Sequence, residues 1–185
     1  MRDAAFERAG FRVGPFSVSL DPGERKTATF ANNSEANVIA LLAAGLVKAT
    51  SGQVFVDEFD PRVQPVHVKR LTGYVPHDAL PHEFSTFSRY IHYRASLWGI
   101  DPNDAMSRAR IMSERLDGVH EAFAYPLIGS LLAAPKLLVL DRPQAAYAPQ
   151  IIAVAGERTA IFSTHVSERE ARQFEGSAAI AHAEA

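Results

Sequence analysis

Cysteine is absent from the 185 residues of this sequence. Its absence excludes disulfides, thiolate metal sites and cysteine nucleophiles together. Long apolar runs are missing too, since no stretch approaches the roughly 18 consecutive apolar residues of a membrane-spanning helix. The first ten residues, MRDAAFERAG, are too charged for a signal peptide. We therefore expect a cytoplasmic protein that reaches the inner face of a membrane only through a partner.

A strong charge of either sign is also missing. The formal net charge is -2 and the isoelectric point is about 6.4, so the composition gives no reason to expect a nucleic-acid partner. Apolar residues make up 47% of the chain, which is enough for one continuous core. We expect a single domain over residues 1–185.

The apolar pattern predicts strands that alternate with helices. Strands are expected at 16–20, 27–30, 53–56, 72–75, 136–140, 159–163 and 177–182. Helices are expected at 34–45, 85–98, 102–116, 127–134 and 167–174. The helix at 102 has the clearest start, because Asp101 can cap it and Pro102 suits the first helical position. Such alternation predicts an α/β fold with a mainly parallel sheet.

Five segments of the chain form a recognisable series: LDPGE, AAGLVKATSGQVFVDEFDP, LTGYVPHDALPHEFSTFSRYIHYRASLWGID, LLAAPKLLVLDRP and TAIFSTHVSEREA. Together they resemble the ATP-binding cassette (ABC) transporter nucleotide-binding subunit, because they occur in that family's order and at nearly that family's spacing. The third is similar to the segment that carries the Q-loop, the fourth to the strand that ends in the Walker B aspartate, and the fifth to the switch-histidine strand. The middle of the chain looks most like exporter-type cassettes that pair with separate membrane subunits.

The resemblance implies a P-loop NTPase-like three-layer sandwich. It would have a mainly parallel sheet, an antiparallel β portion at the N-terminus and a helical insert at residues 82–125. Its implied partners are a membrane permease subunit, an intact ABC subunit or a second copy of the chain.

The family's phosphate loop does not survive in this sequence. Such loops need glycines, so that the backbone can approach phosphate closely, and a lysine that reaches the β- and γ-phosphates. The matching stretch here is FANNSEAN, residues 30–37. Only Asn32 matches; Ala36 takes the place of the lysine and Asn37 that of the Ser/Thr that holds magnesium. Phe30 and Glu35 take the places of the two glycines, and Glu35 brings a negative charge to a site built for phosphate.

Most other family positions are also changed. His77 stands at the Q-loop glutamine, and Arg142 stands where the family has a general-base glutamate. A guanidinium does not lose its proton in proteins and cannot activate water. Asp141 of Walker B and His165 of the switch are kept. The signature motif is absent from AYPLIG at 124–129, and the segment is shorter by about two helical turns.

Each kept residue also has a structural interpretation. Asp141 would cap a loop or pair with Arg142, and His165 would be a strand-end residue bonded to the backbone. His77 and His82 are close enough in sequence for a metal site, but a solvated loop is the expected state. The aromatic helix at 85–98 would dock a membrane subunit if its aromatic face is exposed. Packing against the next helix is the alternative.

The hypothesis that the sequence favours is a degenerate ABC-type ATP-binding subunit, a pseudo-ATPase with an interaction or regulatory role. The degenerate nucleotide positions are Asn32, Ala36, Asn37, His77, Asp141 and His165. No cofactor is expected. One alternative is a functional ATP-binding subunit, which would need ATP and Mg²⁺. Another is a non-transport protein that uses this fold for dimerisation or for a different ligand, with the old cleft collapsed or filled by Phe30.

Overall fold

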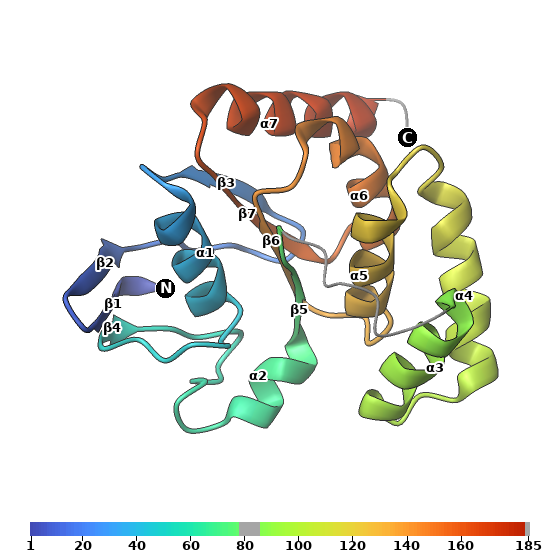
Figure 1. Ribbon diagram of the computed structural model, residues 1–185, viewed down its shortest axis with the longest axis horizontal. Coiled ribbons are helices and arrows are strands. Elements are labelled where there is room, and N and C mark those ends of the chain that lie inside the picture. The colour runs from blue at the N-terminus through green and yellow to red at the C-terminus, as the bar shows by residue number, and fades with distance from the viewer. Residues whose placement is uncertain (78–85, 184–185) are drawn as a thin grey trace.

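A four-stranded parallel sheet forms the centre of the protein (Figure 1). The structure, a computed structural model, describes residues 1–77 and 86–183, and the side chains up to residue 176. The strand order is β3-β7-β6-β5, with bounds β3 (Arg25–Thr29), β5 (Thr72–Val75), β6 (Leu137–Asp141) and β7 (Ala160–His165). These strands confirm the predictions at 27–30, 72–75, 136–140 and 159–163 to within a few residues. The predicted α/β class is confirmed.

Side chains of the two central strands point alternately to the two faces of the sheet. On β6, Leu138 and Leu140 pack into one apolar cluster while Val139 packs into another. On β7, Ile161 and Phe162 divide in the same way. β6 is therefore apolar up to Asp141 and β7 is apolar from Ala160 to Phe162, as expected for strands covered on both faces.

Helices cover the two faces of this sheet (Figure 1). The helix α1 (Asn33–Ala43) packs on one face, where Ile39 and Leu42 are fully buried against Val139 and Phe162. On the other face lie α5 (Glu121–Leu131), α6 (Ala148–Ala155) and α7 (Glu168–Ala183), the second of them preceded by a short 3-10 turn at Ala145–Tyr147. The predicted helix at 127–134 begins earlier, because His120 caps α5 and Pro126 is tolerated inside it.

A second, antiparallel sheet of order β2-β1-β4 lies beside α1. Its strands are β1 (Arg2–Arg8), β2 (Phe11–Phe16) and β4 (Ser51–Gln53). The predicted antiparallel β portion is therefore confirmed, but the strand at 16–20 is wrong, because β2 ends at Phe16 and the next four residues are not strand. The strand predicted at 53–56 is displaced towards the N-terminus, and β1 was not predicted.

The helical insert packs on α5 at the far side of the molecule (Figure 1). It contains α3 (Phe87–Trp98) and α4 (Pro102–Arg115), with Asp101 accepting bonds from the backbone N–H groups of Asn103 and Asp104 as predicted. Residues 82–85 of the predicted insert, and with them His82, lie outside the described residues. A short helix, α2 (Pro65–Leu71), precedes β5 and was not predicted.

The strand predicted at 177–182 is wrong. The backbone of α7 continues as a helix from Glu168 to Ala183. Alanine is the best helix former, so the alanines of SAAIAHA extend a helix already begun. The predicted helix at 167–174 is thus the first half of a longer one. None of the helices described in residues 1–77 and 86–183 is long and apolar enough to cross a bilayer.

Candidate functional site

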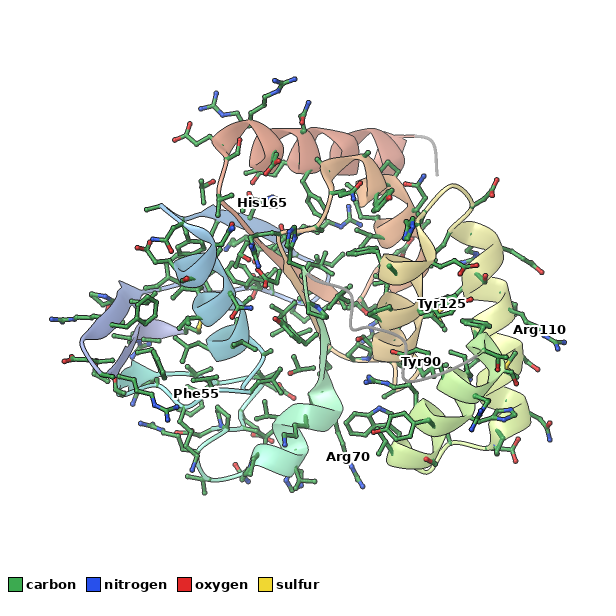
Figure 2. The ribbon with its side chains drawn as sticks, viewed as in Figure 1. Phe55, Arg70, Tyr90, Arg110, Tyr125 and His165 are labelled. Carbon is green, nitrogen blue, oxygen red and sulfur yellow. The ribbon has the colours of Figure 1, made fainter. Side chains whose placement is uncertain are left out.

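The predicted nucleotide positions gather at one end of the parallel sheet. Asp141 and His165 are the last residues of β6 and β7, and Asn32 caps the N-terminus of α1. The backbone N–H of Phe30 donates to the carbonyl of His165 at 2.8 Å, which ties the loop before α1 to the end of β7. Figure 2 shows His165 beside the N-terminal half of α1. In α/β folds, ligands bind at this carboxyl end of the strands.

Glu35 folds back over the N-terminus of α1. Its backbone N–H donates to the Asn32 side-chain oxygen at 3.0 Å, and its carboxylate accepts from the Asn32 side-chain amide at 2.9 Å. The same carboxylate accepts from the backbone N–H of Ala31 at 3.4 Å. This is a variant of the capping box. A carboxylate of the chain itself therefore sits where the unpaired N–H groups and the dipole of a helix attract an anion.

The two positions after Glu35 turn into the protein. Ala36 is fully buried and carries no charge or donor. Asn37 donates its side-chain amide to Asp141 Oδ2 at 2.8 Å and to the Tyr74 hydroxyl at 3.3 Å. Asn37 thus bonds to Asp141 directly, where the family's Ser/Thr at this position would hold magnesium.

Asp141 is buried, and its carboxylate accepts four hydrogen bonds. Oδ1 accepts from Arg142 Nε at 2.8 Å and from the Thr164 hydroxyl at 3.2 Å. Oδ2 accepts from Asn37 at 2.8 Å and from Arg142 Nη2 at 3.2 Å. Burial alone would raise the pKa of Asp141, but the bonds from Arg142 and Asn37 outweigh it and hold the pKa below its ordinary value. A carboxylate has about four lone-pair positions, so none is left over for a metal ion.

Arg142 adopts an uncommon backbone conformation that supports this pairing. Its φ is +51°, in the left-handed region that few residues other than glycine occupy. The side chain folds back on Asp141 as a bidentate ion pair, with the two side chains only 12% and 1% exposed. The predicted pairing is confirmed. His77 Nδ1 lies 3.0 Å from the Arg142 carbonyl oxygen, to which it can donate, so the Q-loop position contacts the backbone of Arg142.

His165 is fully buried. Its Nε2 lies 3.1 Å from the Ser163 hydroxyl, and its Nδ1 has no hydrogen-bond partner among the described residues. The ring packs against Phe174 of α7 with 5.6 Å between ring centroids. Burial lowers its pKa, although Glu170 and Glu175 act in the opposite direction. The predicted bond from this ring to the backbone is wrong, since the partner is a side chain; the ring is held neutral inside the protein.

Two side chains of this network were not predicted. Tyr74 of β5 bonds to Asn37, and burial together with the nearby Asp141 charge raises its pKa to about 12. Thr164 faces Asp141 because the two residues are partners in the parallel register of β7 and β6. The sequence placed each of the two residues directly after a predicted strand, at 136–140 and 159–163, but it did not predict that these strands are neighbours.

The aromatic residues near the site divide between packing and exposure. Phe30 packs edge-on against Phe16 at 5.3 Å, next to the cluster under α1. In the insert, Phe87 and Tyr90 pack against Tyr125 of α5, whereas Tyr93 and Leu97 are about half exposed. The predicted aromatic helix therefore uses part of its apolar surface for internal packing and leaves part uncovered.

No family model matches the chain, but solved structures do. An ATP-binding subunit of an ABC transporter aligns with a TM-score of 0.71 and 14% identity, over 89% of this chain and 78% of that one. The protein cbiO1 from Clostridium perfringens, part of the ABC transporter complex cbiONQ, aligns at 0.72 and 15%, over 90% and 77%. A dimeric ATP-binding cassette bound to ADP and phosphate aligns at 0.68 and 11%, over 93% and 89%.

The chain has the fold of ABC transporter ATP-binding subunits. At these identities the likeness shows the fold alone, and the chemistry has to be argued from the residues. The P-loop NTPase-like architecture that the sequence predicted is thereby confirmed.

Proposed function

We propose that this chain is an ABC-type subunit that has lost ATP binding and hydrolysis and serves an interaction or regulatory role in an ABC transporter complex. The observation that carries the proposal is the state of Asp141, the one acidic residue kept at a magnesium-binding position. All four of its acceptor positions are taken by Arg142, Asn37 and Thr164. A guanidinium of the chain neutralises the charge that would attract a metal ion.

The residues at these positions do not fit magnesium-bound triphosphate. Loss of a lysine ammonium about 4 Å from a phosphate forfeits on the order of 4 kcal/mol at an effective dielectric constant of about 20. The Glu35 carboxylate would repel a phosphate, because its negative charge lies at the start of α1. It is held there by the Ala31 backbone N–H and the Asn32 side-chain amide. Arg142 cannot act as the general base. The positions that would hold magnesium, Asn37 and Asp141, bond to each other instead.

In the ABC family each ATP site forms between two subunits, because the phosphate loop of one subunit faces the signature motif of the other. This chain lacks both motifs, so pairing with an intact subunit would leave no complete site. We therefore propose that it docks, without hydrolysing, on a membrane permease subunit, on an intact ABC subunit or on a second copy. The half-exposed Tyr93 and Leu97 of α3 are candidates for the docking surface.

The experiment measures ATP binding and phosphate release by the full chain. Equilibrium dialysis with ATP and Mg²⁺ and a phosphate-release assay should both give no signal up to millimolar ATP. An intact cassette subunit assayed in parallel shows that the conditions support binding.

The matched control is the double variant Asp141→Asn/Arg142→Met, which removes the retained carboxylate without leaving the buried Arg142 charge unpaired. Micromolar ATP binding or phosphate release by the wild type that disappears in this double variant would overturn the proposal in favour of a functional ATP-binding subunit. Release that persists in the double variant comes from a contaminant and leaves the wild-type chain without activity, as proposed.

A further inference from the structure

A cavity of about 1020 Å³ opens at the other end of the parallel strands from the predicted nucleotide positions. It lies where β6 and β7 begin, between these strands, the C-terminal end of α1 and the N-terminal sheet. None of the six predicted nucleotide positions lines it. In the view of Figure 2, Phe55, which lines the cavity, lies below α1, whereas His165 lies beside its upper half.

The floor of the cavity is apolar. Val18, Leu20 and Leu137 line it and are partly exposed, whereas Phe162 of β7, which also lines it, is only 1% exposed. The Phe55 ring lines it as well and is 47% exposed, which is unusual for a phenylalanine next to a buried apolar surface. Ligand sites are concave and mostly apolar, with a few polar groups that orient the ligand, and this cavity has that composition.

The charged side chains that line the cavity are mainly cationic. They are Arg2, Lys136, Arg158 and a single carboxylate, Asp57. The Asp57 carboxylate forms a salt bridge with Lys136, with 2.6 Å between Asp57 Oδ2 and Lys136 Nζ. Two guanidinium groups are therefore left without an opposing carboxylate among the lining residues, on a chain whose net charge is -2. A cation-lined concave site raises the local concentration of anions.

We propose that this cavity binds an amphipathic organic anion, with its apolar body on Phe55, Leu20 and Leu137 and its negative group facing Arg158 and Arg2. The ligand class follows from the two halves of the lining. A small inorganic anion would leave the apolar floor unused, and an apolar cation would meet two guanidinium groups. The proposal does not depend on the state of the nucleotide positions.

Decanoate is the probe, and isothermal titration calorimetry of the full chain is the measurement. Decanoate should bind saturably, whereas decyltrimethylammonium, which has the same chain and the opposite charge, and acetate, which lacks the chain, should not. Arg158→Glu should weaken decanoate binding about tenfold or more at low salt, because it replaces an attraction with a repulsion. Phe55→Ala should also weaken it, through lost apolar contact.

Arg110→Glu is the matched control, because it makes the same charge change on the exposed surface of α4, far from Phe55 in Figure 2. Its affinity for decanoate should equal that of the wild type. The absence of saturable decanoate binding would overturn the proposal. So would binding that Arg158→Glu and Phe55→Ala leave unchanged, and so would equally tight binding of decyltrimethylammonium.

Discussion

At the residue scale, the central feature of the candidate site is the buried ion pair of Asp141 and Arg142. The two side chains are almost fully buried, so removing one partner leaves the charge of the other buried and uncompensated. Leaving an unpaired buried charge costs far more than the pair itself contributes. The pair is therefore an obligate structural unit.

Arg142→Met should destabilise the protein by about 3 kcal/mol, because Asp141 loses its cation while staying buried. The double variant Asp141→Asn/Arg142→Met should recover most of this loss, since no charge is then left unpaired. Urea denaturation at pH 7 measures both. Equal destabilisation by the single and the double variant would show that the charge of Asp141 is not what Arg142 compensates.

Stability should fall as the pH drops from about 6.5 towards 5, in part because of His165. Burial lowers the pKa of His165 in the folded protein, so below its ordinary value of about 6.5 the unfolded chain takes up a proton that the folded chain refuses. The linkage slope for one such group is at most about 1.4 kcal/mol per pH unit. Urea midpoints at pH 7.5 and pH 5.5 measure the loss, which should be smaller in His165→Gln.

His92→Gln is the control for this pH dependence, because His92 is an exposed histidine on α3. It should reproduce the wild-type loss. If His165→Gln loses as much stability as wild type between the two pH values, His165 is not held neutral by burial.

The sequence could predict the pairing of Asp141 with Arg142, because the two residues are adjacent. It could not predict that Asn37 donates to Asp141 across 104 positions, since that contact exists only after α1 has packed beside β6. The bond from Asn37 to the Tyr74 hydroxyl could not be predicted for the same reason. The local chemistry of a residue is visible in sequence, and its long-range partners are not.

At the element scale, helices with strong local signals were predicted well and charged strands were not. α4 begins at Pro102 because Asp101 caps it, and both signals are in the sequence. β1 was missed because its buried residues, Ala4 and Ala5, are consecutive. A register irregularity between Ala4 and Phe6 replaces the alternation that marks a strand. α7 was cut short because its second half was interpreted as a strand.

The packing of the insert on α5 depends on Gly129. A Cβ at this position would lie 2.8 Å from ring carbons of Tyr90 on α3, and Arg94 of α3 donates to the Gly129 carbonyl at 3.0 and 3.2 Å. Gly129→Ala should therefore destabilise the protein by about 1–3 kcal/mol through overpacking, despite the better helix propensity of alanine. Thermal or urea denaturation measures the change.

Gly176→Ala is the matched control, because a Cβ there would contact nothing within 4 Å in the part of the chain whose side chains are described. It should stabilise the chain by up to about 1 kcal/mol, since Gly176 lies inside α7. A Gly129→Ala variant as stable as Gly176→Ala would mean that Tyr90 does not hold the insert in the described position.

At the scale of the whole molecule, the two ends of the parallel sheet have opposite characters. At the carboxyl end the chain places its own cation, Arg142, and its own anion, Glu35, beside the predicted nucleotide positions. At the amino end a cavity is left open with guanidinium groups on its wall. Apolar clusters on the two faces of the sheet lie between these ends.

The most direct test of the central claim is the melting temperature of the full chain, titrated with ATP and Mg²⁺. A ligand at about 100 times its dissociation constant stabilises a protein by about 2.7 kcal/mol, which for a chain of this size is a rise of about 5–10 °C. We predict no rise up to millimolar ATP, because Asp141 and the start of α1 are already occupied by side chains of the protein. A saturable rise of several degrees that the double variant Asp141→Asn/Arg142→Met abolishes would contradict the account.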